Sequence, residues 1–240
     1  MKKAAKITFV LLIAVVIVCC AAIKLNENYS FVQLAEIATS EDEFIRINAE
    51  NDDFKYLITQ DGVTLIKYKG ESETPEIPEK IEEHHVYKIK NSCFAGNEAI
   101  KSISLPKTLK YIDNFAFYNC KNLESVEFND GLSVIGDSAF RKTALTNIEF
   151  PSTLFYIGSA AFMDCEELEN AVFHNNTSLK IGMCAFRSTG IKQLSLPAGT
   201  YEIEKSAFTK CKHLTIINIP EESDASVKGI ADYGVKIIRN

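Results

Sequence analysis

The sequence has little of what catalysis, metal binding and nucleic-acid binding usually require. Only 4 histidines occur among 240 residues, and the formal net charge is -6, so the surface should repel phosphate backbones. No glycine-rich loop has the spacing of a nucleotide-binding motif, because Gly136, Gly158 and Gly182 each follow a recurring isoleucine instead. These absences predict no nucleic-acid partner and no nucleotide cofactor.

The histidines and carboxylates form no recognisable catalytic or metal-binding pattern. His84 and His85 are adjacent, so on an extended chain they point to opposite faces, and no further ligand has metal-binding spacing nearby. Glu127 and Glu149 recur at one outward position of neighbouring strands, which a repeat produces without catalysis. We therefore expect no catalytic residue, no metal and no cofactor, and a protein that is not an enzyme.

A long uncharged segment lies at the amino terminus. Residues 7–23, ITFVLLIAVVIVCCAAI, follow the basic flank MKKAAK and contain no charged side chain. As a helix this segment would be about 26 Å long, close to the thickness of a hydrocarbon core and longer than the apolar region of most signal peptides. An uncleaved anchor, with a membrane helix and the rest of the chain outside, is favoured. A signal peptide cleaved near Cys20 and Ala21, or a lipid-attached cysteine, is the alternative.

The segments on either side of the centre differ in pattern. Residues 24–51 are polar and suggest a stalk with one short helix, because Ser40 and Glu43 have capping-box spacing. Residues 54–68 alternate between apolar and polar around Asp61-Gly62, which predicts a β-hairpin with a two-residue turn. The expected organisation is a signal segment (1–23), a stalk (24–51), a hairpin cap (52–85), a repeat solenoid (86–220) and a C-terminal cap (221–240).

Six copies of a short unit fill the middle of the chain. One phenylalanine recurs at intervals of 23, 23, 22, 24 and 22 residues, and one isoleucine keeps step with it. The two series are Phe94, Phe117, Phe140, Phe162, Phe186 and Phe208, and Ile89, Ile112, Ile135, Ile157, Ile181 and Ile203. A period of this length is typical of leucine-rich solenoids, in which no turn can bury its own apolar face. We predict a mostly β solenoid with short helical turns and an internal stack of the phenylalanines.

The strand segment of each unit supplies the candidate binding residues. Alternation places Val126 and Phe128 inside and their neighbours outside. The outward residues of successive strands that we single out are Ser125, Glu127, Asn147, Glu149, Asn170, Val172 and Gln193. A second candidate patch is aromatic and consists of Tyr111, Phe155 and Tyr156.

The 7 cysteines do not suggest a disulfide framework. Three share one position of the unit, but threonine holds that position in the intervening units, so like cysteines would lie two layers and about 10 Å apart, beyond disulfide reach. In chain order this position holds Cys120, Thr143, Cys165, Thr189 and Cys211. We assign Cys93 and Cys184 to the small, buried position next to the phenylalanine and predict no structural disulfide.

The repeats resemble those of bacterial BspA-like surface proteins, which carry leucine-rich repeats of type 5. The copies IDNFAFYNCKNLESVEF, IGSAAFMDCEELENAVF and IEKSAFTKCKHLTIINIP carry the resemblance, which covers about residues 52–220. It implies an extracytoplasmic protein, either anchored through residues 7–23 or secreted after their cleavage. Family members with assigned roles bind proteins or adhere to other cells.

Two functions are compatible with this sequence. In the first, a non-enzymatic extracytoplasmic protein binds a protein or a cell-surface glycan through its exposed sheet face. In the second, the chain is a structural or assembly component of the cell envelope with no external ligand. Changing Glu127 and Glu149 to lysine should impair the first function and spare the second.

Overall fold

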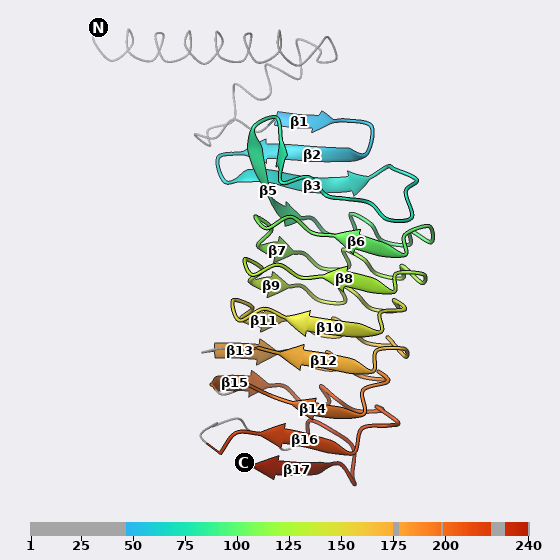
Figure 1. The fold of residues 1–240 in the computed structure, drawn as a ribbon, viewed down its shortest axis with the longest axis vertical. Helices are drawn as coiled ribbons and strands as arrows, with labels where there is room; N and C mark the ends of the chain where they lie inside the picture. The colour runs from blue at the N-terminus through green and yellow to red at the C-terminus, as the bar shows by residue number, and fades with distance from the viewer. Residues whose placement is uncertain (1–46, 175–177, 198, 222–228, 240) are drawn as a thin grey trace, which may run out of the picture.

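The computed structural model describes residues 47–174, 178–197, 199–221 and 229–239, which form a β-solenoid of about 7 turns (Figure 1). The predicted anchor (1–23) and the helix expected near Ser40 lie outside these ranges. Within them there is no helix, and hence none that is long and apolar enough to cross a membrane. The prediction of short helical turns in each unit is therefore wrong for the described residues.

One sheet runs along most of the described solenoid and contains one strand from each of the six repeats. Its strands from β3 onward are parallel except β4, which pairs antiparallel with β5. The recurring isoleucines pair with one another across β5, β7, β9, β11, β13 and β15. The strands are β1 (Ile47–Glu50), β2 (Phe54–Thr59), β3 (Gly62–Tyr68), β4 (Lys80–Ile81), β5 (His84–Ile89), β7 (Tyr111–Ile112), β9 (Val134–Ile135), β11 (Tyr156–Ile157), β13 (Ser178–Ile181) and β15 (Thr200–Ile203). The predicted isoleucine series is thus confirmed, and its members lie opposite one another in neighbouring strands of this sheet.

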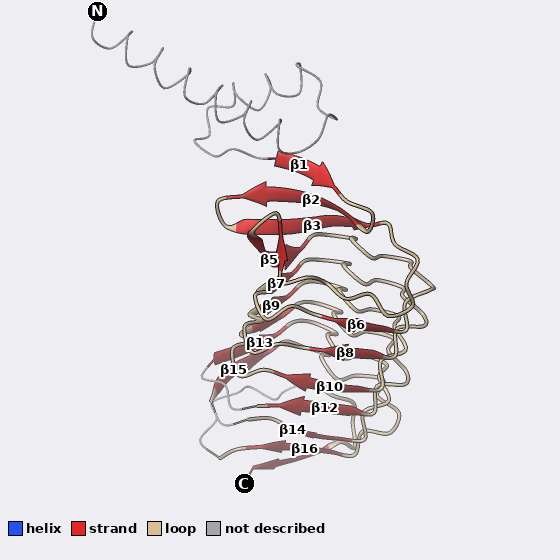
Figure 2. Ribbon diagram, turned by 45° about the horizontal axis from the view of Figure 1, so that its top comes forward, coloured by secondary structure: helices blue, strands red, loops and turns tan. Residues whose placement is uncertain are grey.

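The second face consists of three short parallel sheets instead of one continuous sheet (Figure 2). These sheets are formed by β6 (Ser102–Ser104) with β8 (Ser125–Glu127), by β10 (Asn147–Phe150) with β12 (Asn170–Phe173), and by β14 (Gln193–Ser195), β16 (Ile216–Ile219) and β17 (Lys236–Arg239). Proline directly follows β10 and β16, where its missing N–H ends the pairing.

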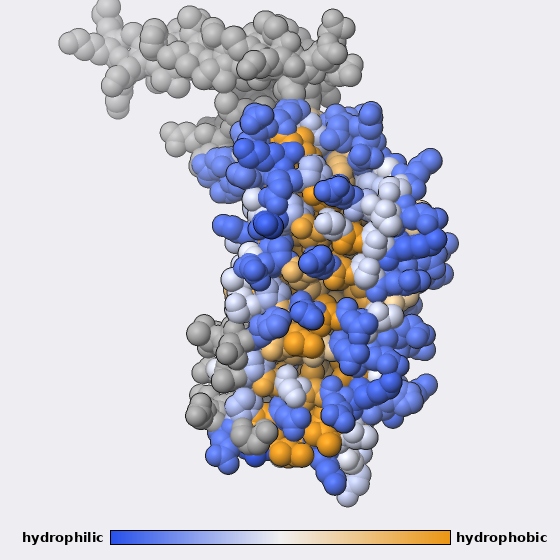
Figure 3. Space-filling view, in the orientation of Figure 1, coloured by the Kyte–Doolittle hydropathy of each residue, from blue (hydrophilic) through white to orange (hydrophobic). Residues whose placement is uncertain are grey.

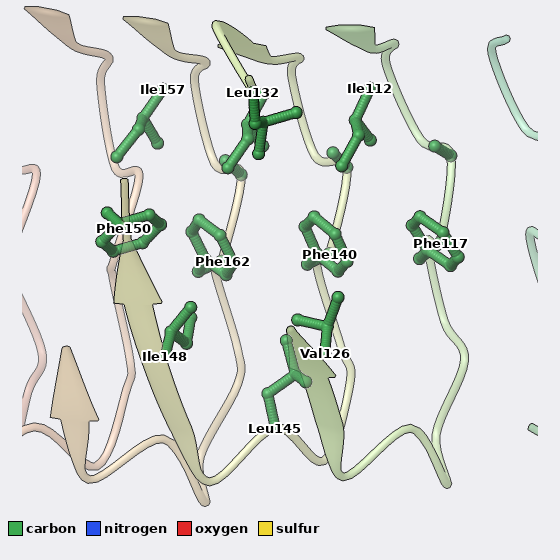
Figure 4. Packing of buried hydrophobic residues seen from close by; sticks show 14 of the residues in the cluster. Ile112, Phe117, Val126, Leu132, Phe140, Leu145, Ile148, Phe150, Ile157 and Phe162 are labelled. Atoms are coloured by element: carbon green, nitrogen blue, oxygen red, sulfur yellow. The ribbon is translucent and has the colours of Figure 1, made fainter. Parts of the chain in front are cut away.

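The phenylalanines form the predicted internal stack (Figure 4). The six rings are at most 1% exposed, and consecutive centroids lie 4.7, 4.9, 5.3, 5.2 and 5.2 Å apart with interplanar angles of 13° or less. Tyr68 of the hairpin extends the stack, with its ring 5.0 Å from Phe94. Each ring is therefore buried by its neighbours, which confirms that no turn forms a core alone.

The corner that carries each phenylalanine is an extended series of turns in which alternate N–H groups point along the solenoid axis. The N–H groups of Phe115, Phe117 and Asn119 donate to the carbonyls of Asp137, Ala139 and Arg141 at 2.9, 2.7 and 2.8 Å. This pattern requires positive φ angles of 53° to 71° at two positions per unit, two residues before and two residues after the phenylalanine. The two sets are Ser92, Phe115, Ser138, Ala160, Cys184 and Ser206, and Gly96, Asn119, Lys142, Asp164, Ser188 and Lys210.

This corner corrects the assignment of Cys184. Cys184 has φ 57° and belongs to the first positive-φ set, whereas Ala185 lies next to Phe186. Cys93 does hold the small position and is fully buried. Cys120, Cys165 and Cys211 alternate with threonines as predicted, and the thiol of Cys165 lies 3.2 Å from Thr143 Oγ1. All five described cysteines are free.

The glycine that follows the recurring isoleucine allows adjacent turns to approach closely. A Cβ at Gly158 would lie 2.5 Å from the backbone nitrogen of Asp137, and one at Gly136 would lie 2.6 Å from that of Asn114. This close approach permits side chains to bind the next turn, since Asn114 Oδ1 accepts from Asp137 N–H and Asp137 Oδ1 accepts from Ser159 N–H, both at 2.8 Å. The glycines are thus structural.

The amino-terminal end of the solenoid is covered by three antiparallel strands. The predicted hairpin forms as β2 and β3, but Thr59 pairs with Gly62, so the two turn residues are Gln60 and Asp61, and only Gly62 has positive φ. The predicted Asp61-Gly62 turn is therefore displaced by one residue. β1 adds an unpredicted strand to β2 within the range assigned to the stalk.

The last described turn differs from the others. Phe208 N–H donates to Ile230 O at 2.7 Å, as each earlier phenylalanine does to the following turn, which places Ala231 where a seventh ring would lie. β17 then pairs with β16 but leaves Ile237 and Ile238 37% and 40% exposed. This end of the described solenoid is less covered than the hairpin end.

Candidate functional site

The structure places all seven predicted binding residues on the outer face of the second set of strands, with exposed side chains. It does not place them on one sheet. Asn147 pairs with Asn170 and Glu149 with Val172 on β10 and β12. Ser125 and Glu127 lie on the β6–β8 sheet, and Gln193 lies on the sheet of β14. We call this row of outward residues the outer strip.

The β10–β12 part of the outer strip has fixed polar groups beside an exposed apolar side chain. Asn170 Nδ2 donates to Asn147 Oδ1 at 2.6 Å, so the two amides form a ladder between layers. His174 Nε2 lies 3.6 Å from Glu149 Oε2, and both side chains are more than half exposed. Val172, which pairs with Glu149, is 45% exposed. This arrangement offers hydrogen-bonding groups and apolar contact on one rigid support.

A groove of about 510 Å³ lies beside the outer strip at Glu127 and is also lined by Ser104, Lys107, Phe128 and Asn129. Phe128 was predicted to point inward, and it packs against the core but stays half-buried. The sequence signal for this difference is that asparagine follows Phe128, where proline follows the last residue of β10 and β16. The Asn129 side chain donates to Pro106 O at 2.9 Å, which fixes the loop.

Apolar surface runs along the length of this face. Figure 3 shows orange patches along the middle of this face, interrupted by polar residues and bounded by two polar margins, in the view of Figure 1 in which β6, β8, β10 and β12 face the reader. The outer strip therefore lies next to apolar surface along the solenoid. The exposed large apolar side chains on the described strands of this face are Val172 on β12 and Ile237 and Ile238 on β17.

The predicted aromatic patch does not form as one cluster. Tyr111 and Phe155 are 37% and 52% exposed, but Val134 of β9 separates Tyr111 from Tyr156 in the register of the first sheet. Burial raises the pKa of Tyr156, and the carboxylates of Asp137 and Glu204 add to this. Tyr111 instead contacts Tyr87, which the sequence analysis did not single out, with ring centroids 6.2 Å apart.

The described residues contain no cluster of three or more histidine, cysteine, aspartate or glutamate side chains that could hold a metal ion. Their buried thiols are poor nucleophiles, because burial raises the pKa of Cys93 to about 12 and the pKa values of Cys120 and Cys165 to about 11. Nothing in the described part of the chain points to catalysis.

Comparison with solved structures identifies bacterial leucine-rich repeat proteins. A leucine-rich repeat protein of T. pallidum, TpLRR, is 25% identical, with a TM-score of 0.67, and the match covers 79% of this chain and 92% of that one. A leucine rich cell surface protein of Faecalibacterium prausnitzii is 20% identical with a TM-score of 0.54, covering 76% and 57% of the two chains. The pneumococcal vaccine antigen PcpA is 21% identical with a TM-score of 0.53, covering 78% and 48%.

The family model for the BspA type leucine rich repeat region, with 6 copies, matches residues 87–215 and 179–233. No curated protein matches the sequence. The matched residues include all six phenylalanine units and most of the described solenoid, and together they span more than half of the chain. The chain therefore belongs to the BspA type leucine-rich repeat family.

Proposed function

We propose that this protein is a non-enzymatic, extracytoplasmic binding protein that recognises another protein through the outer strip. The observation that carries the proposal is the β10–β12 patch, where the hydrogen-bonded amides of Asn147 and Asn170 lie beside the exposed side chain of Val172. Exposed polar groups alone are common on any sheet face that contacts water. Their combination with apolar surface on a fixed support favours a protein partner.

Rigidity is the physical advantage of this face. The backbone positions of Asn147, Glu149 and Asn170 are set by parallel pairing, and the core beneath them is fully buried at Ile148 and nearly so at Ala171. Side chains on such a support lose little conformational freedom when a ligand binds, so more of the contact energy contributes to affinity.

The proposed location outside the cytoplasm rests on two observations. Residues 7–23 provide an uncharged segment after a basic flank, suited to an anchor or to a signal peptide that is cleaved. One solved relative is described as a cell surface protein and another as a vaccine antigen. We include membrane attachment through residues 7–23 in the proposal, with secretion after cleavage as the alternative.

The test is cross-linking on intact cells that express the wild type or the double variant Glu127→Lys, Glu149→Lys. A partner captured by the wild type should be captured at least about tenfold less by the double variant, because two charges on the outer strip are reversed. The matched control is Glu166→Lys, Glu167→Lys, which makes the same charge change at exposed residues before β12. Equal loss in both variants, or no loss in either, would contradict the proposal.

An assembly role in the cell envelope is the second candidate, and β17 is the observation that favours it. Its four residues are exposed, and Ile237 and Ile238 present apolar side chains at one end of the described solenoid. In this case Ile238→Asp should abolish the captured contact while the Glu127→Lys, Glu149→Lys variant retains it. The two variants thus separate the two functions in one experiment.

A further inference from the structure

A second groove lies on the opposite sheet, between the hairpin and the first repeats. It has a volume of about 480 Å³ and is lined by Asp61, His85, Tyr87, Thr108, Lys110 and Tyr111. These residues come from the hairpin turn, from β5, from the segment that leads into β7 and from the first residue of β7. The groove is separate from the outer strip and contains none of its residues.

Two tyrosines form one wall of this groove. The rings of Tyr87 and Tyr111 are 6.2 Å apart and nearly perpendicular, at 89°. Tyr111 is 37% exposed, while Tyr87 is half-buried beneath the hairpin turn. The exposed ring of Tyr111 therefore offers an apolar aromatic surface to the groove, and its phenol group can still hydrogen-bond.

The groove lies between segments that are held together by close backbone packing and by hydrogen bonds to backbone carbonyls. Gly62 lies so close to β5 that an added Cβ would collide with the carbonyl oxygen of His85 and come within 3.2 Å of the Tyr87 ring. On the other side, Thr108 Oγ1 donates to Val86 O at 2.7 Å and Lys110 N–H donates to Tyr87 O at 2.8 Å. The site is therefore formed before any ligand binds.

The polar groups around the tyrosines are available to a ligand. Among the described residues, the side chains of Asp61, His85 and Lys110 are exposed and form no hydrogen bond or ion pair. Asp61 and Lys110 carry opposite charges, so the groove has no strong preference for a polyanion. It offers a carboxylate acceptor, an ammonium donor and an imidazole around a flat apolar wall.

We propose that this groove binds a neutral pyranose oligosaccharide. One face of a pyranose ring carries mainly C–H groups, which stack on an aromatic ring, and its rim carries hydroxyl groups that both donate and accept. Tyr111 supplies the stacking surface, and Asp61, His85 and Lys110 hydrogen-bond the hydroxyls. The volume of the groove is within the usual range for small-molecule sites, about 300–1,000 Å³.

The test uses the full chain, purified in a detergent without a sugar headgroup. Cellotriose, mannotriose, galactotriose and the trimer of N-acetylglucosamine are titrated by NMR, with a hyaluronan tetrasaccharide and a ten-residue polyproline peptide as competing classes. At least one neutral trisaccharide should bind. Tyr111→Ala should weaken it about tenfold or more, and Tyr111→Phe should retain most of the affinity because the stacking ring remains.

The matched control is Phe155→Ala, which removes an exposed aromatic side chain directly before β11 of the same sheet, outside the groove. It should bind the trisaccharide like the wild type. The proposal is overturned if no neutral trisaccharide binds, if Tyr111→Ala and Phe155→Ala weaken binding equally, or if only hyaluronan or polyproline binds in the groove. The Glu127→Lys, Glu149→Lys variant should bind the trisaccharide normally, so failure at either surface leaves the other proposal intact.

Discussion

The inner and outer residues of the solenoid differ in how much they change from turn to turn. The inner corner holds phenylalanine in six consecutive units, and each ring except Phe208 is stacked between two others. The outer strip, on strands of the same units, changes from Ser125 to Asn147, Asn170 and Gln193. An inner residue must fit the shape of the layers above and below, whereas an outer residue must only tolerate water. The repeat therefore fixes the fold inside and leaves the outside free for recognition.

The largest expected effect comes from a cavity in the stack. Phe140→Ala removes a fully buried ring that lies 4.9 Å from Phe117 and 5.3 Å from Phe162. We expect the free energy of unfolding, measured by urea denaturation, to fall by about 3–5 kcal/mol. Asn147→Ala on the outer strip should change it by less than about 0.5 kcal/mol. A similar loss of stability in both variants would contradict the proposed difference between the buried stack and the outer strip.

A medium effect concerns the buried thiols at alkaline pH. Burial raises the pKa of Cys93 from 9.0 to about 12. Between these two pH values the thiol keeps its proton in the folded state and loses it in the unfolded state. The contribution of the protonated thiol to stability is fully present below pH 9 and is lost as the pH rises toward 12. Over this range the free energy of unfolding falls by about 1.4 kcal/mol per pH unit.

Cys93→Ala isolates this contribution, because alanine holds the same position in the other five units. Between pH 9 and 11 the free energy of unfolding of the wild type should fall about 2 kcal/mol further than that of the variant. The measurement is urea denaturation in the presence of a reductant. Parallel pH curves for the two proteins would show that Cys93 does not contribute.

The smallest effect tests the corner turns and should be stabilising. Lys142 is exposed and has φ 62°, a conformation that costs a non-glycine residue about 1–2 kcal/mol. Lys142→Gly removes that cost but gives the unfolded chain more freedom, so a net gain of about 0.5–1 kcal/mol is expected in thermal or urea unfolding. Asn119→Gly at the equivalent position should increase stability less, since asparagine tolerates positive φ angles better than lysine does. A loss of stability in Lys142→Gly would contradict this account.

The spacing of the phenylalanines and isoleucines predicted the solenoid, its register and its internal stack, because a side chain repeated in every layer must meet its copies. The corner conformation could not be predicted in this way. Its positive φ angles fall on Phe115, Lys142 and Cys184, which have no preference for that region, and arise because alternate N–H groups bind the next turn.

The candidate site was predictable only in part. Strand alternation correctly placed Glu127 and Val172 outside, but the break of the second face into three sheets has no signal in the repeat spacing. The tyrosine groove was missed because Asp61 is far in sequence from Tyr111, and only the pairing of β3 with β5 brings the hairpin turn beside the first repeat. Contacts between a repeat and a non-repeated segment leave no periodic signal.

The stack of rings also has a consequence for how such a gene can change. Each ring contacts only the turns before and after it, so a duplication or deletion of one whole unit rejoins surfaces that already fit. A lineage could thereby lengthen or shorten the outer strip in single steps without redesigning the interior. Insertion of one residue inside a core strand has the opposite result, because every following side chain of that strand changes face.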